Sequence, residues 1–288
     1  MMMVLKKISR LLMLGLLCHS PCLLADDDGR YDGLEPREKF EIRLGAFLAD
    51  DYDTSLRLDS NRYLLGGLID FEDDLNLDSN KSTWRVDGFY RFNERHRMSF
   101  NVYSSRRDGK RRIDRGVSVG GPGGLPGFEF PLNAQVSSKM DYDLIRLGYD
   151  YSFVNRRKFE AMIGGGVNFR HLDVEAAYQI NVGQRQRGNS LGAEEWLPLP
   201  VVGMGGRWNF TDKLQANIRF DLFYLQFDNY EGYYHEALLN IEHNTFENFG
   251  FGLGLNFGDL NLRGREDDIR GEFDSRTQAL VGYMKYYF

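Results

Sequence analysis

Hydrophobic and polar residues alternate with a period of two along most of the chain. This pattern predicts β-strands, because successive side chains of a strand point to opposite faces. Between Leu214 and Tyr224 the even positions are apolar or aromatic, whereas the odd ones are mainly Gln, Asn, Arg and Asp. Between Phe249 and Phe257 every odd residue is Phe or Leu and every even one is Gly or Asn. The same alternation recurs in residues 84–92, 97–103 and 145–153.

The length and content of these segments favour strands that cross a membrane. The pattern extends over roughly 9 to 16 residues in each, whereas a strand of a globular protein has about 5 or 6. The polar faces mix charges of both signs with glycines, as a crowded barrel interior would, and aromatic residues gather toward the strand ends of the apolar faces. A soluble sandwich would also alternate, but it would turn its polar faces to water.

The pattern predicts an all-β fold, a single antiparallel up-and-down transmembrane β-barrel of twelve strands. The expected strands are 39–49, 52–59, 63–71, 82–92, 95–106, 138–153, 158–174, 195–209, 213–227, 232–242, 248–263 and 272–288. Residues 50–80 could instead form one long outer excursion, which would leave ten strands. An even number is expected either way.

Turn residues support this meander. Short polar turns, expected on the periplasmic side, occur at 93–95, 155–157 and 211–213. Longer loops, expected on the extracellular side, occur near 106–137, 181–194 and 228–231.

The first 25 residues resemble an export signal. Three basic residues precede an apolar run from Leu11 to Leu17, which is too short to span a bilayer as a helix. We expect cleavage near Ala25, a short periplasmic segment over 26–38, and one barrel domain over 39–288. Cys18 and Cys22 lie within the signal, so the mature protein is expected to form no disulfide and to use no cysteine chemistry.

Composition narrows the function classes further. Loss of the three basic residues of the signal, with no acidic ones, changes the formal charge from −6 to −9. An acidic chain of this kind argues against a nucleic-acid-binding protein. No apolar stretch of about 18 residues follows the signal, so a membrane span must be made of strands.

The last strand carries the most specific feature. The chain ends in Phe288, and one parity of the final strand is apolar or aromatic: Leu280, Met284, Tyr286 and Phe288. The chain thus resembles a Gram-negative outer-membrane β-barrel protein of small to medium, porin-like size, over residues 39–288. Gly282 stands six residues before the end, one further than the commonest spacing of the family's assembly signal. The resemblance implies an outer-membrane location, contact with its lipids and lipopolysaccharide, and insertion by periplasmic chaperones and the barrel-assembly machinery.

Charged residues gather on the inward parity of the strands. The set is Arg43, Arg85, Asp87, Arg91, Arg97, Arg146, Asp150, Glu160, Arg170, Arg207, Arg219 and Asp221. One interpretation is an ion-pair network that fills and stiffens the barrel, since buried charges need partners. The alternative is a narrow conduit that favours anions.

A second basic cluster follows an outward-running strand. Its members are Arg106, Arg107, Lys110, Arg111, Arg112 and Arg115. They could pair with lipopolysaccharide phosphates at the extracellular rim, or they could form a solvated loop. The glycine-rich residues 120–127 predict a flexible loop, because the lysine and hydroxyl residue of a phosphate-binding loop are missing.

Barrel enzymes that act on lipids are the main alternative function. They use a histidine with a serine, amide or acidic partner. The mature chain has His96, His171, His235 and His243, none of them in a His-x-Ser arrangement. His171 is the best candidate base, with a structural role at the membrane interface as the competing interpretation. The scattered histidines give no reason to expect a metal or another cofactor.

The sequence therefore predicts a non-enzymatic outer-membrane barrel, either a narrow channel for small solutes or a structural component of the envelope. A lipid-modifying enzyme is the second hypothesis, and a surface adhesin or receptor is the third.

Overall fold

The protein is described here by a computed structural model. It describes residues 38–60, 65–74, 76–77, 82–112, 117–119, 128–130, 135–156, 158–182, 185–227, 229–266 and 269–288. The expected signal peptide, and residues 26–37 of the expected periplasmic segment, lie outside these ranges. Within them, no helix is long and apolar enough to cross a membrane.

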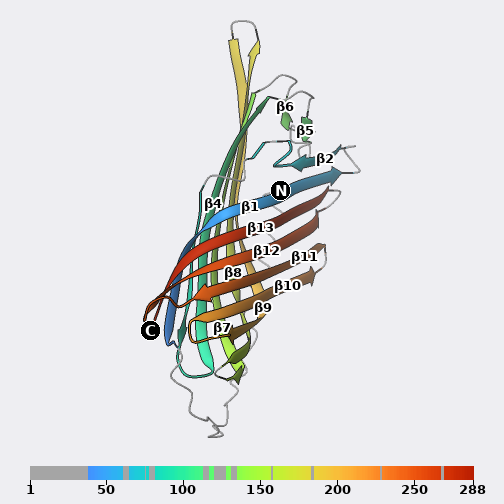
Figure 1. The fold of residues 1–288 in the computed structure, drawn as a ribbon. Coiled ribbons are helices and arrows are strands. Elements are labelled where there is room, and N and C mark those ends of the chain that lie inside the picture. Colours follow the sequence, from blue (N-terminus) through green and yellow to red (C-terminus); the bar gives the residue numbers. More distant parts are fainter. Residues whose placement is uncertain are drawn as a thin grey trace.

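Ten antiparallel strands close into a barrel (Figure 1). The main sheet has 11 strands, of which β2 (Leu65–Asp70) pairs only with β1, and the other ten form a ring because β1 also pairs with β13. The ring consists of β1 (Phe40–Ser60), β3 (Ser82–Arg91), β4 (His96–Arg112), β7 (Gln135–Asn155), β8 (Phe159–Val182), β9 (Arg185–Asn209), β10 (Leu214–Phe227), β11 (Tyr230–His243), β12 (Phe249–Glu266) and β13 (Ile269–Tyr287). The short strands β5 (Val117–Val119) and β6 (Phe128–Phe130) form a separate hairpin.

The up-and-down barrel is confirmed, but the expected twelve strands are wrong and the alternative of ten is right. The segments 39–49 and 52–59 are one strand, β1, which carries a bulge between Phe47 and Ala49. Before the bulge even residues such as Leu44 point outward, and after it Tyr52 and Thr54 point inward and are buried. A bulge inserts one residue, so the inward-facing and outward-facing positions of the strand change places after it. In the sequence, this break in the alternation resembles the end of a strand. The segment 63–71 contains β2, which flanks the outer half of β1.

The two ends of the barrel differ. We call the end with the short connections the turn end. The expected turns at 93–95 and 211–213 are confirmed there, as the β3–β4 and β9–β10 connections, and Asn155 and Arg156 of the expected turn at 155–157 lie at the β7–β8 connection, where residue 157 is outside the described residues. The chain's described residues also begin and end there, with the Lys39 and Phe40 amides donating to the Phe288 carbonyl. We call the opposite end the loop end. The expected loop at 181–194 is wrong, because β8 and β9 continue as a ribbon that pairs up to Val182 and Arg185.

The outer surface of the barrel is apolar. Large hydrophobic side chains that alternate with buried polar ones are exposed along the ring strands, for example Leu147 at 51%, Ile163 at 56% and Leu253 at 56%. A protein in water would not expose so much apolar surface, whereas a bilayer covers it. Aromatic side chains such as Phe153, Trp208 and Phe288 lie on this surface at the turn end, as in an interfacial girdle.

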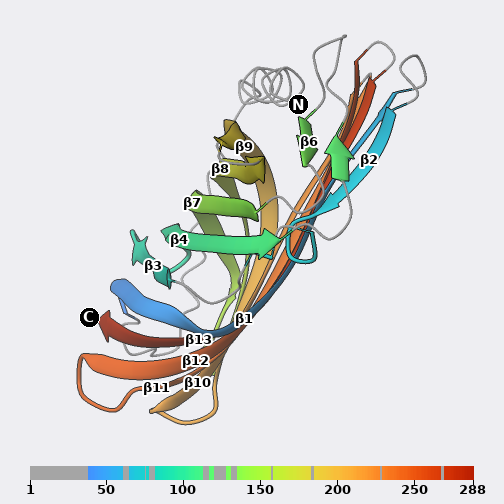
Figure 2. The same cartoon turned by 90° about the horizontal axis from the view of Figure 1, so that it is seen from above.

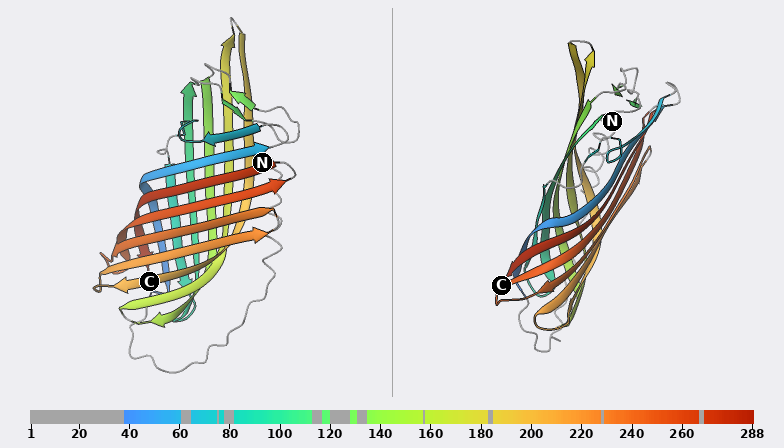
Figure 3. Two further views of the ribbon diagram at one scale, coloured as in Figure 1. Left: turned by 90° about the vertical axis from the view of Figure 1, so that its right-hand side faces the viewer. Right: turned by 45° about the horizontal axis from the view of Figure 1, so that its top comes forward.

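Toward the loop end the wall separates into two groups of strands. One contains β1 and β10–β13, and the other contains β4 and β7–β9 (Figures 2 and 3). Pairing between β9 and β10 stops at Val202 and Leu222, although β9 pairs with β8 along its whole length. Pro198 and Pro200 explain the stop. They fit an antiparallel ladder with β8 only if their nitrogens face away from it, toward β10, where they cannot donate.

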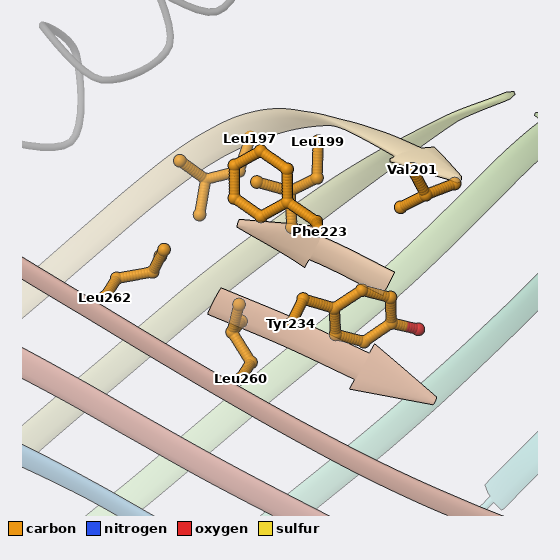
Figure 4. Packing of buried hydrophobic residues seen from close by; sticks show 7 residues of the cluster. All are labelled: Leu197, Leu199, Val201, Phe223, Tyr234, Leu260 and Leu262. Carbon is orange, nitrogen blue, oxygen red and sulfur yellow. The ribbon is translucent and has the colours of Figure 1, made fainter. Parts of the chain in front are cut away.

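Two apolar clusters lie inside the barrel at this end. The first joins both groups of strands and consists of Leu197, Leu199, Val201, Phe223, Tyr234, Leu260 and Leu262 (Figure 4). The second consists of Phe71, Leu77, Val136, Met140 and Ala176. Where main-chain pairing between the groups is interrupted, side-chain packing holds them together.

Candidate functional site: the charged barrel interior

The twelve charged residues assigned to the inward parity all lie on the inner face of the barrel. Nine of them are less than a tenth exposed. The side chains of the other three, Arg43, Asp87 and Arg219, are 12%, 15% and 16% exposed. Because the lumen is narrow, these side chains meet across it, and they form tiers from the turn end to the loop end.

The turn-end tier consists of three basic and three acidic residues. Lys285 Nζ lies 2.6 Å from a Glu242 oxygen and 3.8 Å from a Glu41 oxygen, and all three side chains are fully buried. Arg207 donates to Glu38 at 2.9 Å and to Glu41 at 3.1 Å. The sixth member, Arg43, contacts both Glu41 and Glu242.

The sequence pattern did not single out Glu41, Glu242 and Lys285. Each is a charged residue of inward parity near the turn end of its strand, so the alternation itself could have found them. Lys285, for example, lies between the outward residues Met284 and Tyr286.

Glu38, one of the acidic members of this tier, lies in the chain just before β1. Burial is the largest single effect on the pKa of Glu38 and raises it, but the positive charge of Arg207, a backbone hydrogen bond and the charges of Lys285 and Arg91 together outweigh burial and hold the pKa below its usual value of 4.5. The carboxylate form is therefore stabilised by folding.

A separate ion pair, between Arg91 and Glu160, lies at the turn end on the opposite side of the lumen. Both terminal nitrogens of Arg91 donate to the Glu160 carboxylate, at 2.9 and 3.2 Å, and Glu160 also accepts from the Ser152 hydroxyl. Arg91 belongs to β3 and Glu160 to β8, which are not neighbours in the sheet. The pair therefore spans the lumen.

The central tier contains four arginines and three aspartates. Arg146 Nε lies 2.8 Å from Asp221, and Arg219 donates to Asp150 at 3.0 Å. These contacts join β7 to β10 across the lumen, since β8 and β9 lie between them in the sheet. Arg97 donates to Asp150 at 3.1 Å.

The remaining central pair lies near the wall. Arg85 donates to Asp87 at 2.8 Å, and Asp87 also accepts from Arg43 at 2.9 Å.

Glycines on the inner face make room for this tier. A Cβ atom at Gly164 would collide with the Asp150 carboxylate, and one at Gly203 would collide with that of Asp221. A Cβ at Gly148 would lie 2.8 Å from an Arg146 nitrogen. The mixture of glycines and charges on the polar faces thus has a steric cause.

The third tier is aromatic. The Arg170 guanidinium lies 4.0 Å from the centre of the Tyr234 ring and 5.8 Å from that of Tyr142. Glu236 accepts from the Tyr234 hydroxyl at 2.7 Å and from Asn256 at 3.0 Å. A positive charge over an aromatic face is attracted to its quadrupole, so the two rings hold Arg170 in place.

These tiers leave little free space. One cavity of about 80 Å³ lies within the central tier, and one of about 30 Å³ lies within the aromatic tier. A larger concavity, about 1330 Å³, lies on the apolar outer face over β9–β13 and β1, and is lined by residues such as Leu44, Ile241 and Leu253. Its lining faces the membrane, so it belongs to the lipid-covered surface.

The basic cluster predicted after residue 105 divides between the two faces of β4. Arg106, Lys110 and Arg112 are exposed, on the outer face of the loop end, and Arg111 is half-buried. Arg107 is only 4% exposed and lies inside the barrel over the Tyr52 ring, with Glu72 2.5 Å away. It is not available to a lipid headgroup, because alternation turns it inward. Arg115 and residues 120–127 lie outside the described residues.

The candidate base His171 faces outward. Its Nδ1 lies 3.3 Å from Asp143 and its Nε2 lies 3.1 Å from Glu194, while its ring stacks on Trp196 with centroids 4.6 Å apart. Both ring nitrogens thus have carboxylate partners on the outer face of the barrel, away from the charged interior.

The other histidines also lie on the outer surface or in turns. His96 contacts Tyr149, His235 is about half exposed and lies 3.8 Å from Asp259, and His243 contacts Thr245. Within the described ranges, no three His, Cys, Asp or Glu side chains are placed to hold a metal ion.

The outer face of β13 carries the apolar residues of the terminal motif. Met284, Tyr286 and Phe288 are 45%, 45% and 57% exposed, and Leu280 is half-buried. They alternate with buried inward residues.

Comparison with known proteins identifies the fold. No protein-family model matches the sequence, and no curated protein matches it. The crystal structure of the outer membrane protease OmpT from Escherichia coli is similar, with a TM-score of 0.59 and 9% identity over 86% of this chain and 96% of that chain. The toluene transporter TodX of P. putida also matches, with a TM-score of 0.34 and 9% identity over 88% and 91%. A TM-score this low supports no argument.

The fold is that of a Gram-negative outer-membrane β-barrel protein. The closed ten-stranded ring, the apolar outer band and the polar interior agree with this assignment. At 9% identity the similarity to OmpT shows the fold alone, because one fold hosts many activities.

Proposed function

We propose that the protein is an integral, non-enzymatic outer-membrane barrel with a closed interior, which acts as a structural and interaction component of the envelope. The observation that carries this proposal is the set of ion pairs that cross the lumen. They join β3 to β8 and β7 to β10. The internal spaces found among the described residues of the tiers are about 80 and 30 Å³.

A continuous solute path would require several of these pairs to separate at once. Breaking one buried pair leaves a charge without a partner and costs about 3–5 kcal/mol. The turn-end and central tiers lie in series along the lumen, so both would have to open. This cost favours a closed barrel over the narrow anion channel that the arginines alone suggest.

Planar-bilayer recording tests the closed interior. We expect no discrete current steps from the purified protein under conditions where a known porin conducts. The double variant Arg146→Ala/Asp221→Ala removes both members of one crossing pair, and should produce steps or flicker. An Arg276→Ala variant on the outer surface is the matched control and should remain silent. Steady steps from the wild-type protein would overturn the proposal and support a channel.

Lipopolysaccharide is the proposed lipid partner. Arg106, Lys110 and Arg112 are exposed on the outer face of β4, beyond the apolar band, where lipid phosphates would lie. Arg106→Ala/Lys110→Ala should lose lipopolysaccharide-dependent stabilisation in mixed micelles, whereas Arg107→Ala should retain its dependence on added lipopolysaccharide. Equal dependence in wild type and double variant would contradict this assignment. Insertion is proposed to use periplasmic chaperones and the barrel-assembly machinery, through the terminal strand.

A further inference from the structure

The outer wall of the barrel carries an apolar concavity of about 1330 Å³ over β9–β13 and β1. Strands β10–β13, coloured orange to red, face the viewer in the left view of Figure 3. The lining combines small outward-facing residues, Gly206, Ala216 and Gly282, with large apolar side chains such as Ile241 and Leu253. Small residues beside large ones hollow the wall, so an acyl chain seated there would contact protein on more than one side.

Two lysines border this concavity at the turn end. Lys158 directly precedes Phe159, and Lys213 directly precedes Leu214, and both of these apolar residues line the concavity. The two lysines are exposed. The Lys158 carbonyl accepts from the Asn209 amide at 2.9 Å, at the start of the β9–β10 turn, and Lys213 is the last residue of that turn. The lysines therefore flank one turn, next to the apolar lining.

His243 and Trp208 complete this margin of the concavity. His243 pairs in register with Leu214 and lines the concavity. Trp208 is 55% exposed, and its ring lies 5.8 Å from that of Phe159 and 6.1 Å from that of Phe210. Aromatic side chains of this kind lie at the level of lipid headgroups, and lysines at strand ends extend their ammonium groups toward the phosphates. An apolar groove thus adjoins groups that can bind a lipid phosphate.

The charges at the turn-end margin favour an anionic headgroup. Within the described parts of the β7–β8, β9–β10 and β11–β12 connections, exposed basic residues outnumber exposed acidic ones. The basic residues are Arg156, Lys158 and Lys213, and the acidic ones are Asp212 and Glu247. A phosphate beside the β9–β10 turn would meet the ammonium groups of both lysines, which attract anionic lipids.

The loop-end margin of the same wall has the opposite balance. Arg276 is shared there by two aspartates, Asp53 at 3.8 Å and Asp259 at 3.7 Å, and His235 also contacts Asp259. An anionic headgroup would meet these carboxylates and be repelled. The charges therefore orient a bound lipid with its headgroup at the turn end.

We propose that the concavity binds a phospholipid with an anionic headgroup, of which phosphatidylglycerol is the simplest example. Its acyl chains lie along the apolar lining, and its phosphate lies beside the β9–β10 turn, between Lys158 and Lys213. The turn end is expected to face the periplasm, and the phospholipids of an outer membrane lie in that leaflet. The inference is independent of the closed interior proposed above, because the site lies on the outer wall.

Native mass spectrometry of the detergent-purified protein tests the site. The protein is titrated with dioleoylphosphatidylglycerol or with dioleoylphosphatidylcholine, which has the same acyl chains but no net charge. We expect phosphatidylglycerol to bind about tenfold more tightly, the factor that about 1.4 kcal/mol of additional attraction produces. Equal affinities for the two lipids would overturn the proposal.

Three variants separate the headgroup contacts from the acyl-chain contacts. Lys158→Gln/Lys213→Gln should lose the preference for phosphatidylglycerol. Lys139→Gln/Arg276→Gln removes the same number of positive charges from the outer face at the loop end, and as the matched control should retain the preference. Ala216→Phe adds bulk within the concavity, and should weaken the binding of both lipids while preserving the ratio of their affinities.

The two lipids are compared within each variant, so a general loss of stability does not imitate the result. A preference that survives in Lys158→Gln/Lys213→Gln, or that disappears equally in the loop-end control, would overturn the headgroup site. Unchanged affinities in Ala216→Phe would show that the acyl chains lie elsewhere and would overturn the concavity as the binding site. A preference lost only in the turn-end variant, together with weaker binding in Ala216→Phe, supports the proposal.

Discussion

The turn-end half and the loop-end half of this barrel are held together by different forces. In the turn-end half each ring strand pairs with both neighbours, and buried ion pairs cross the lumen. In the loop-end half the β9–β10 ladder is interrupted and apolar clusters join the two groups of strands. Charge pairs need fixed geometry and so fit a complete main-chain ladder, whereas apolar packing tolerates two sheets that diverge. The turn end is therefore the rigid end of the barrel, and the loop end is the adaptable one.

The largest effect is expected at the turn end. Glu242→Ala removes the carboxylate that Lys285 and Arg43 share, and leaves the buried Lys285 with a 3.8 Å contact to Glu41 and the face of the Tyr287 ring at 5.0 Å. We expect a loss of about 3–5 kcal/mol in unfolding free energy. Urea unfolding followed by tryptophan fluorescence in micelles measures it, with Glu247→Ala in an exposed turn as the control. A loss as small as that of the control would mean that the tier adds little to stability.

A smaller and local effect is expected at the loop end. Leu199→Ala opens a cavity in the first apolar cluster, where Leu199 is fully buried, and should cost about 2–4 kcal/mol. Because the neighbouring ladder is interrupted, the damage should remain local. Proteases should cut β9 near the cluster while the turn-end half stays protected. Cleavage spread evenly along the barrel would show that the two halves unfold together.

Restoring the interrupted ladder should have a moderate effect. Pro198→Val/Pro200→Val supplies two amide donors on the β10 side of β9, and should stabilise the loop end by about 1 kcal/mol. Hydrogen exchange of Tyr224 and neighbouring amides in β10 should slow, and Pro200→Val alone should give a smaller change. Amides of β12 and β13, which do not adjoin β9, are the internal reference and should exchange as in wild type. Unchanged exchange in β10 would show that something other than the prolines ends the pairing.

The smallest effect concerns pH. The pKa of Glu38 lies below its usual value of 4.5, so its contribution is fully present above that value and disappears as the pH falls through the lowered pKa. Wild type should therefore lose stability on acidification below about pH 4.5 more steeply than Glu38→Gln. Unfolding in urea on either side of that pH measures the difference. Parallel stability curves for the two proteins would contradict this role.

Much of this architecture could be predicted from alternation alone. Each predicted inward charge lies on the inner face, because the period of two fixes the facing of a strand once one residue is placed. The first strands were not predictable in the same way. The bulge at Leu48 exchanges the inward-facing and outward-facing positions of β1. The aspartates that follow it resemble a turn in the sequence, although Asp53 lies within β1 and contacts Arg276.

The pairing inside the barrel could not be predicted either. Alternation places Arg146 and Asp221 on inner faces, but their contact depends on which strands oppose each other across the lumen. That relation follows from the number of strands and their stagger, which a local pattern does not contain.

Pro198 and Pro200 have a consequence beyond this one molecule. The outer part of β9 is a long strand edge without a partner on its β10 side among the described residues, and such an edge can recruit a strand from a neighbouring protein. In a crowded membrane, such pairing between strands of different molecules would join barrels into aggregates. The two prolines remove two donors from the part of that edge nearest the barrel, so a neighbouring strand would meet a gap in the ladder where the ribbon leaves the wall.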